Sequence, residues 1–204
     1  MGYCEIKIIN HYKLGISPKI TKATIIGKKI HQDLEEADKL IPRETATEQQ
    51  LKNPYVDLDF PREETKIVID RSPFIYIGRI DKCIRLDGNV VIIDDKVSKS
   101  GKVFERPFMD KILQLSCYCE GFLNGYSNLL VFNKIFFKVV QRDIDGNVIS
   151  EYEEEYNEKL RNLLIGKFQR FEDIYNQKIQ PEHCNNANKC RACSYFHGCK
   201  WRLE

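Results

Sequence analysis

The 204-residue sequence has no long apolar run, no excess of charge of either sign, no internal repeat and no low-complexity tract. No apolar stretch approaches the about 20 residues that span a bilayer, so the sequence excludes a membrane bundle and predicts no membrane partner. Its 32 basic and 30 acidic residues leave a formal net charge of +2, which does not by itself indicate a nucleic-acid-binding protein. The hydrophobic fraction of 42% excludes a disordered chain and favours one domain over residues 1–204.

The N-terminal residues lack the apolar stretch of a signal peptide, and Ile6 stands where a myristoylation signal has Ser or Thr. We therefore expect a cytoplasmic protein. The sequence contains eight cysteines. In a reducing compartment these are expected to be metal ligands or buried thiols before disulfides.

Hydrophobic periodicity predicts a mixed α/β chain. An amphipathic helix is expected from about residue 25 to 40, followed over 41–64 by a proline-rich loop or lid with a short helix around 47–51. Three strands with turn residues between them are predicted to form an antiparallel meander: 66–70, 74–81 and 89–96. The remaining predicted elements are a helix from 108 to about 125, a strand over 128–140, a hairpin turn at 145–146 and a long helix over 153–177.

Two carboxylates and a lysine are predicted to converge at neighbouring strand ends. Asp81 ends the second predicted strand, and Asp94, Asp95 and Lys96 end the third. Because side chains alternate along a strand, Asp94 and Lys96 share one face while Asp95 points away. Asp81 and Asp94, with the backbone carbonyl of Asp95, can hold a divalent ion, and Lys96 can offset negative charge on a phosphate. The alternative is that these residues merely end an exposed strand.

Two helical positions add to this pattern. His31 lies at the edge of the apolar stripe of the first helix, where it can reach a metal, although a single histidine there is more often structural. Gln114 and Tyr118 are spaced i, i+4 and point the same way, so they could contact DNA or form a simple surface pair.

The order of these residues resembles the RecB-like branch of the PD-(D/E)XK nucleases. The matching motifs are Gly27-x3-His31, Gly78-x2-Asp81, Asp94-x-Lys96 and Gln114-x3-Tyr118. The resemblance implies a restriction-endonuclease-like core with a mixed central sheet flanked by helices. It also implies that His31, Asp81 and Asp94 bind Mg²⁺ or Mn²⁺, that Lys96 is the catalytic lysine, and that Gln114 and Tyr118 support DNA contact.

The C-terminal cysteines follow the pattern Cys184-x5-Cys190-x2-Cys193-x5-Cys199. Thiolates at this spacing suit an iron–sulfur cluster or zinc. The last three resemble the cysteine triad of iron–sulfur RecB-like nucleases, including the CRISPR-associated exonucleases of the "Cas-four" type.

That resemblance implies a fourth ligand from far upstream, so that a cluster joins the two ends of the chain, about 1–24 and 180–204, outside a core of about 25–178. Cys4 is favoured and Cys184 is its rival, with His183 and His197 as outside candidates. A [4Fe–4S] cluster is expected in preference to a [2Fe–2S] cluster. Cys83, Cys117 and Cys119 are interpreted as structural.

Basic and aromatic residues alternate after the proposed catalytic strand. This pattern fits a groove for a DNA strand, although lysines scattered over a solvated face are the simpler interpretation. The residues are Lys96, Lys99, Lys102, Arg106 and Lys111, with Phe104, Phe108 and Tyr118 among them.

The sequence therefore favours a metal-dependent DNA exonuclease that acts on single-stranded DNA or frayed ends and carries a structural iron–sulfur cluster. CRISPR adaptation and DNA repair are its expected settings, with proteins of those processes as possible partners. The alternative is a non-catalytic nucleic-acid-binding module that contains zinc.

Overall fold

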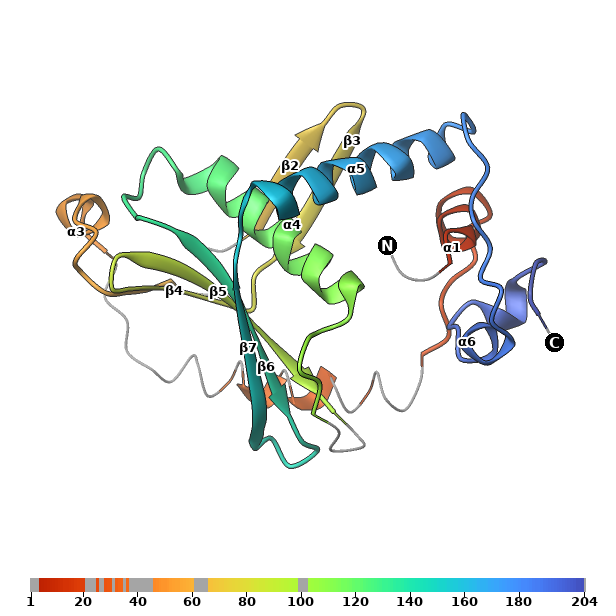
Figure 1. Cartoon of the computed structure of the whole chain (residues 1–204), viewed down its shortest axis with the longest axis horizontal. Coiled ribbons are helices and arrows are strands. Elements are labelled where there is room, and N and C mark those ends of the chain that lie inside the picture. The colour runs from red at the N-terminus through yellow and green to blue at the C-terminus, as the bar shows by residue number, and fades with distance from the viewer. Residues whose placement is uncertain are drawn as a thin grey trace. The chain divides into compact units, whose positions relative to one another are not determined.

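The computed structural model of the chain describes residues 4–20, 25, 28–30, 32–34, 36, 46–60, 66–98 and 103–203 (Figure 1). A helix is expected over about 25–40, and the residues of this span that the structure describes are helical. Gly27, His31, Lys99 and Lys102 lie outside the described residues. The chain divides into two compact units, one of residues 26–161 and one that joins residues 1–25 to residues 162–204.

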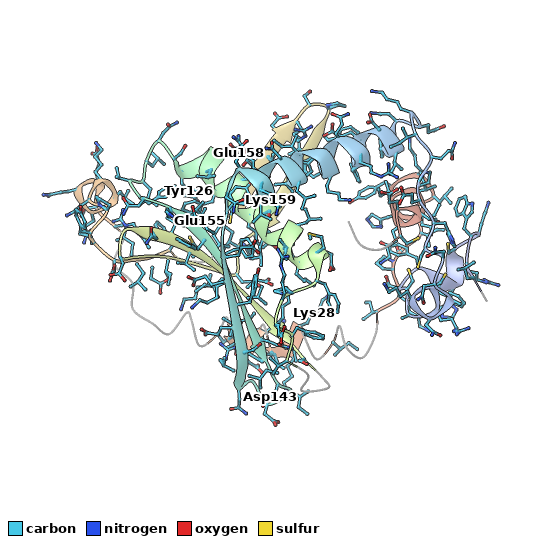
Figure 2. All side chains as sticks on the ribbon, in the orientation of Figure 1. Lys28, Tyr126, Asp143, Glu155, Glu158 and Lys159 are labelled. Atoms are coloured by element: carbon cyan, nitrogen blue, oxygen red, sulfur yellow. The ribbon has the colours of Figure 1, made fainter. Side chains whose placement is uncertain are left out.

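The unit of residues 26–161 is built on a mixed five-stranded sheet with the strand order β1-β4-β5-β6-β7. Its strands are β1 (Leu58–Phe60), β4 (Lys82–Leu86), β5 (Asn89–Val97), β6 (Ile135–Arg142) and β7 (Val148–Glu155). The pair β5–β6 is parallel, and the other neighbouring pairs are antiparallel. Figure 2 labels Asp143 and Glu155 at opposite ends of the β6–β7 hairpin. The carboxyl ends of β5 and β6 lie at the Asp143 end, because Lys96 is opposite Gln141.

Strand β5 is the centre of this sheet. Its first half is apolar and buried, since Val90 and Ile92 are fully covered, as expected of a strand with neighbours on both edges and packing on both faces. The β4–β5 turn is made by Asp87 and Gly88, which both have positive φ angles (48° and 75°). This is the geometry of a two-residue hairpin, so the turn predicted at this point of the sequence is present.

Helix α4 (Met109–Tyr126) connects β5 to β6 and packs on the sheet and on a separate hairpin of β2 (Lys66–Arg71) and β3 (Phe74–Arg79) (Figure 1). Two glycines allow the close approach. A Cβ atom on Gly78 would lie 2.8 Å from the Tyr118 ring, and one on Gly121 would lie 2.7 Å from Ile67. Both distances are shorter than real Cβ atoms tolerate, so larger residues would force α4 away from the hairpin.

The unit formed by the two ends of the chain contains α1 (Ile6–Ile8), the π-helix η1 (Ile9–Lys13), most of α5 (Glu158–Tyr175), α6 (Ala187–Arg191) and the 3₁₀ helix η3 (Phe196–Gly198). Backbone hydrogen bonds join its distant segments. Glu5 N donates to Glu182 O over 3.0 Å, and Lys19 N donates to Ser194 O over 2.8 Å.

The predicted antiparallel meander is confirmed for its first two strands, β2 and β3, and is wrong for the third. Among the described residues β3 pairs with β2 alone and ends at Arg79, while β5 pairs with β6 and with β4, a strand that the sequence pattern missed. The reason is that the inward-facing residues of β4 are Cys83 and Arg85, and a charged residue at a buried position hides the alternation. Asp81 therefore lies in the connection between β3 and β4 and does not end a strand.

Three further boundaries differ from the predictions. The strand expected over 128–140 is β6, which starts at Ile135, and the span 41–64 contains the strand β1, which was not predicted, whereas the short helix expected around 47–51 is present as α3 (Glu48–Lys52). The helix expected from 153 starts at Glu158, because Glu153 and Glu155 belong to β7. These carboxylates form cross-strand ion pairs with Lys138 (3.4 Å) and Lys134 (2.7 Å). None of the described helices is long and apolar enough to cross a membrane.

Arg85 ties the segment before β1 to the sheet. Its side chain is 1% exposed, and its guanidinium donates hydrogen bonds of 2.5–2.9 Å to four backbone carbonyls. The acceptors are in Gln50, Leu51, Val56 and Val131. Since a buried guanidinium must have its donors satisfied, the loop conformation and the arginine stabilise each other.

We expect Arg85→Met to lower the free energy of unfolding by at least about 3 kcal/mol, because each buried acceptor left without a donor costs about 1–3 kcal/mol. Urea unfolding measures this change. Lys52→Met is the matched control. Its side chain is 64% exposed and forms an i, i+4 pair with Glu48, so its loss should cost less than about 1 kcal/mol. Equal midpoints for the two variants would show that Arg85 has no such structural role.

Candidate functional site

Asp94 and Lys96 meet on one face of the sheet at the carboxyl end of β5. Lys96 Nζ lies 2.7 Å from each carboxylate oxygen of Asp94 and donates its hydrogen bond to Oδ1. The side chain of Asp94 is 2% exposed and that of Lys96 is 28% exposed. The carboxylate is therefore buried beneath an ammonium group that still reaches solvent.

Asp81 adds a second carboxylate to this pair. Burial raises the pKa of Asp94 above its usual range, the Lys96 ammonium opposes this rise, and the nearby Asp81 carboxyl adds to it. Two neighbouring carboxyl groups, one of them buried, repel each other when both are ionised. A site of this kind is stabilised by a cation that both groups can bind.

Gln114 and Tyr118 of α4 belong to the same site. Gln114 Nε2 donates to the Tyr118 hydroxyl over 2.9 Å, as their i, i+4 spacing allows. Burial raises the pKa of Tyr118, the hydrogen bond from Gln114 opposes the rise, and the charges of Asp94 and Asp81 add to it. Tyr118 is thus a neutral hydrogen-bond donor beside the carboxylates at neutral pH.

The other predicted site residues are placed differently. The Asp95 side chain points away from Asp94 and accepts a hydrogen bond of 2.6 Å from Arg142 Nε. Arg106 is exposed and pairs with Glu154 at 3.4 Å, so part of its charge is already offset. His31, Lys99 and Lys102 cannot be placed, because they lie outside the described residues.

One atom of the site fits a divalent metal. Asp94 Oδ2 is buried and accepts no hydrogen bond, although Lys96 Nζ is close to it. Hard carboxylate oxygens are the ligands that Mg²⁺ and Mn²⁺ prefer. Among the described residues, no group of three His, Cys, Asp or Glu side chains is arranged to hold a single ion, so Asp81 and Asp94 would need further ligands.

The second candidate site is a small cavity in the unit of the two chain ends. It is lined by Cys4, Cys184, Cys190, Cys193 and Cys199. All five are free thiols. The fold therefore brings together the upstream cysteine, the triad and the rival Cys184.

Backbone and polar groups around these sulfurs fit a thiolate-bound cofactor. Burial raises the pKa of Cys4, but hydrogen bonds from the backbone of Cys184 and Ile6 favour its thiolate. Leu203 N donates to Cys190 Sγ over 3.3 Å. Asn10 Oδ1 and His183 Nε2 are buried without a hydrogen bond, and both residues line the same cavity. The cysteine thiolates of an iron–sulfur cluster bind different iron atoms, so their sulfur atoms lie farther apart than the ligands of a single ion do.

Glu5 holds the two ends of the chain together beside this cavity. Its carboxylate accepts hydrogen bonds from Arg170 and, over 2.8 Å, from the backbone N–H of Glu182, while Arg170 also contacts the Glu182 side chain over 2.9 Å. Glu5 and Glu182 lie next to Cys4 and close to Cys184 in the sequence. This ion-pair network therefore joins the two segments that carry the rival cysteines.

The other cysteines are placed as inert thiols. Cys83 and Cys119 are fully buried in the core, and burial raises the pKa of both. Burial also raises the pKa of Cys117 to about 11. Thiols kept protonated by apolar surroundings react slowly, and none of these three lines the cysteine cavity.

Sequence reasoning missed a group of residues beside Lys96 on β6 and β7, notably Gln141 and Tyr152. They were missed because the last long helix was predicted to start at residue 153, so β7 was not recognised as a strand. The hairpin turn expected at Asp145-Gly146 is the signal that could have identified this strand, because a hairpin turn is followed by a second strand.

The chain resembles two solved structures. It superposes on the crystal structure of SSO0001 with a TM-score of 0.54 and 18% identity, covering 99% of this chain and 84% of that one. It superposes on a "putative exonuclease" from Eubacterium rectale with a TM-score of 0.51 and 10% identity, covering 93% and 80%. No protein-family model matches the sequence, and no curated protein matches it. The chain thus shares an α/β fold with a mixed central sheet that is consistent with a nuclease-like fold, and fold alone does not assign a function.

We expect a double-mutant cycle of Glu5→Gln and Arg170→Gln to give a coupling energy of about 1–3 kcal/mol at pH 7, measured by urea unfolding. Burial tends to raise the pKa of Glu5, but hydrogen bonds from Arg170 and the Glu182 backbone outweigh it, and the pKa is lowered. A lowered pKa stabilises the fold above the usual Glu range, and this contribution is lost as the pH falls through the lowered value.

The coupling should therefore disappear on acidification. The pair Lys178–Asp173 is the control, because it spans 3.7 Å at a lysine that is 66% exposed, and its coupling should stay below about 1 kcal/mol. A coupling between Glu5 and Arg170 that is unchanged in acid would contradict the assignment.

Proposed function

We propose that this protein is a metal-dependent deoxyribonuclease of the RecB-like PD-(D/E)XK kind, acting as an exonuclease on single-stranded DNA or frayed ends. The observation that carries the proposal is the buried Asp94 carboxylate in contact with Lys96, beside Asp81 and Tyr118. The likeness to a structure named a "putative exonuclease" supports it at the level of the fold.

The described residues supply most of what phosphodiester hydrolysis needs. Asp81 and Asp94, with the Asp95 carbonyl and His31 as further ligands, would hold Mg²⁺ or Mn²⁺. When bound, such an ion acts as a Lewis acid and lowers the pKa of water. Lys96 is held in place by its ion pair with Asp94 and presents a partly exposed ammonium group that can offset the charge developing on the phosphate.

Tyr118 and Gln114 act as positioning residues in this proposal. The Tyr118 hydroxyl accepts from Gln114, which orients the phenol and leaves its own hydrogen able to donate to a phosphate oxygen or to a carboxylate. A tyrosine whose pKa is raised keeps that hydrogen at neutral pH. Gly78 allows the Tyr118 ring to lie against the β2–β3 hairpin.

The cysteine-lined cavity is proposed to hold an iron–sulfur cluster, [4Fe–4S] in preference to [2Fe–2S], through Cys4, Cys190, Cys193 and Cys199. Its role is structural, because it would join the two ends of the chain. The setting that the resemblance suggests is CRISPR adaptation or DNA repair.

We expect Lys96→Ala and Asp94→Asn to reduce Mn²⁺- or Mg²⁺-dependent cleavage of end-labelled DNA by at least about 100-fold, since a group that offsets transition-state charge contributes about this much. Lys138→Ala is the matched control, because Lys138 is a partly buried lysine of the neighbouring strand that pairs with Glu151 and Glu153.

The same assay separates the modes of cutting. Linear single strands should be degraded while a covalently closed single-stranded circle is spared. Cleavage that survives in Lys96→Ala at the wild-type rate would refute the catalytic assignment, and cutting of the circle would refute the exonuclease mode.

Anaerobically purified protein is expected to be brown and to contain iron and sulfide. Cys190→Ser, Cys193→Ser and Cys199→Ser should lose the colour, and Cys4→Ser should lose it while Cys184→Ser keeps it. Cys117→Ser is the control. Colour that is lost in Cys184→Ser but kept in Cys4→Ser would make Cys184 the fourth ligand. A colourless wild-type protein that contains zinc would favour a non-catalytic nucleic-acid-binding module.

A further inference from the structure

An apolar pocket of about 210 Å³ opens directly beside Lys96. Strands β5, β6 and β7 form its floor, and the segment that leads into α4 forms its wall. Its apolar lining consists mainly of Phe104, Pro107, Phe108, Val139 and Tyr152. None of these residues is required by the proposed chemistry at Asp94 and Lys96.

The floor of the pocket continues the catalytic face of the sheet. Asp94 is opposite Val139, which is opposite Tyr152, and in the next row Lys96 is opposite Gln141, which is opposite Ser150. Residues opposite each other on neighbouring strands share a face, and strands are about 4.8 Å apart. The pocket floor therefore lies about 5–10 Å from the catalytic pair, a separation that one nucleotide spans from its phosphate to its base.

The wall exposes aromatic rings that the fold itself does not need. Phe104 is 44% exposed and Phe108 is 65% exposed, with ring centroids 5.2 Å apart. Val103 and Met109 beside them are also about half exposed. A contiguous group of exposed apolar side chains indicates a binding surface, and aromatic faces stack on any nucleobase.

Hydrogen bonds fix the wall to the floor. Gln141 Oε1 accepts from the backbone N–H of Phe104 (3.3 Å) and from Ser150 Oγ (2.8 Å). At the rim, Glu154 accepts from the Tyr152 hydroxyl and from Arg106. Because the pocket is already formed, little conformational entropy is lost when a ligand binds in it.

Charge and size indicate the kind of ligand. Lys96 and Lys111 line the pocket with side chains 28% and 39% exposed, so cations accompany an apolar interior, as in grooves that bind a nucleic-acid strand. The volume is below the about 300–1,000 Å³ of pockets for drug-sized ligands and suits a single ring system. A base inside a duplex is stacked and paired and would have to be extruded to enter.

We infer that this pocket binds one unpaired nucleobase of the DNA strand whose phosphate is presented to Lys96. The inference rests on the proposed nuclease function and explains why unpaired ends would be its substrates. Because stacking does not read hydrogen bonds, the pocket accepts all four bases with little preference.

The test measures binding without cleavage. Fluorescence anisotropy of labelled single-stranded oligonucleotides is recorded in EDTA with the full chain, and a strand with 2-aminopurine at its terminal position reports stacking by quenching. Phe108→Ala should weaken binding by about 5- to 150-fold and remove the quenching, whereas Phe108→Trp should keep both. The matched control is Tyr55→Ala, which removes an aromatic ring that is 86% exposed outside the pocket, and it should leave both signals unchanged.

An oligonucleotide with an abasic terminal residue should bind wild type and Phe108→Ala equally. If Phe108→Ala binds and quenches like Tyr55→Ala, or the abasic end loses no affinity, the pocket does not bind a base. These outcomes are independent of catalysis. Pocket-dependent binding by a protein that never cuts DNA would overturn the nuclease function alone, and cleavage by a protein whose Phe108 variants behave as wild type would overturn the pocket alone.

Discussion

The structure of the larger unit depends on the central position of β5, which must be apolar along its buried first half and polar where it leaves the core. Asp94 lies at the boundary, with an exposed fraction of 1%, and it is compensated there by Lys96. A buried carboxylate is costly unless it is paired. Burial raises the pKa of Asp94, and groups whose pKa is shifted in this way are concentrated at functional sites.

The packing of α4 determines where the remaining site residues lie. The helix approaches the β2–β3 hairpin closely only because Gly78 and Gly121 lack side chains. That approach places Tyr118 and Gln114 next to the carboxylates and starts the helix at the wall of the apolar pocket. The Asp94–Lys96 pair and the apolar pocket thus lie on one continuous face of the sheet.

The unit of the two chain ends is held together in a different way, by ion pairs and hydrogen bonds between distant segments. Beside its buried apolar residues, a network of Glu5, Arg170 and Glu182 joins segments far apart in the sequence. Five cysteines gather beside this network. Small units of this kind commonly gain stability from a metal or cluster, because their own apolar burial is limited.

Local patterns in the sequence were sufficient for α4, for the β4–β5 turn and for the shared face of Asp94 and Lys96, because helical periodicity, Asp-Gly turns and strand alternation are local rules. They failed at β4 and β7, where Arg85 faces inward and Glu153 and Glu155 pair across strands, because tertiary contacts reverse the usual polarity. The gathering of Cys4 with the C-terminal cysteines was expected from the family resemblance, and the cavity that they line agrees with it. Only the tertiary structure placed Asp81 in a connection and formed the pocket across three strands. Each of these depends on contacts between residues distant in the chain, which no local pattern encodes.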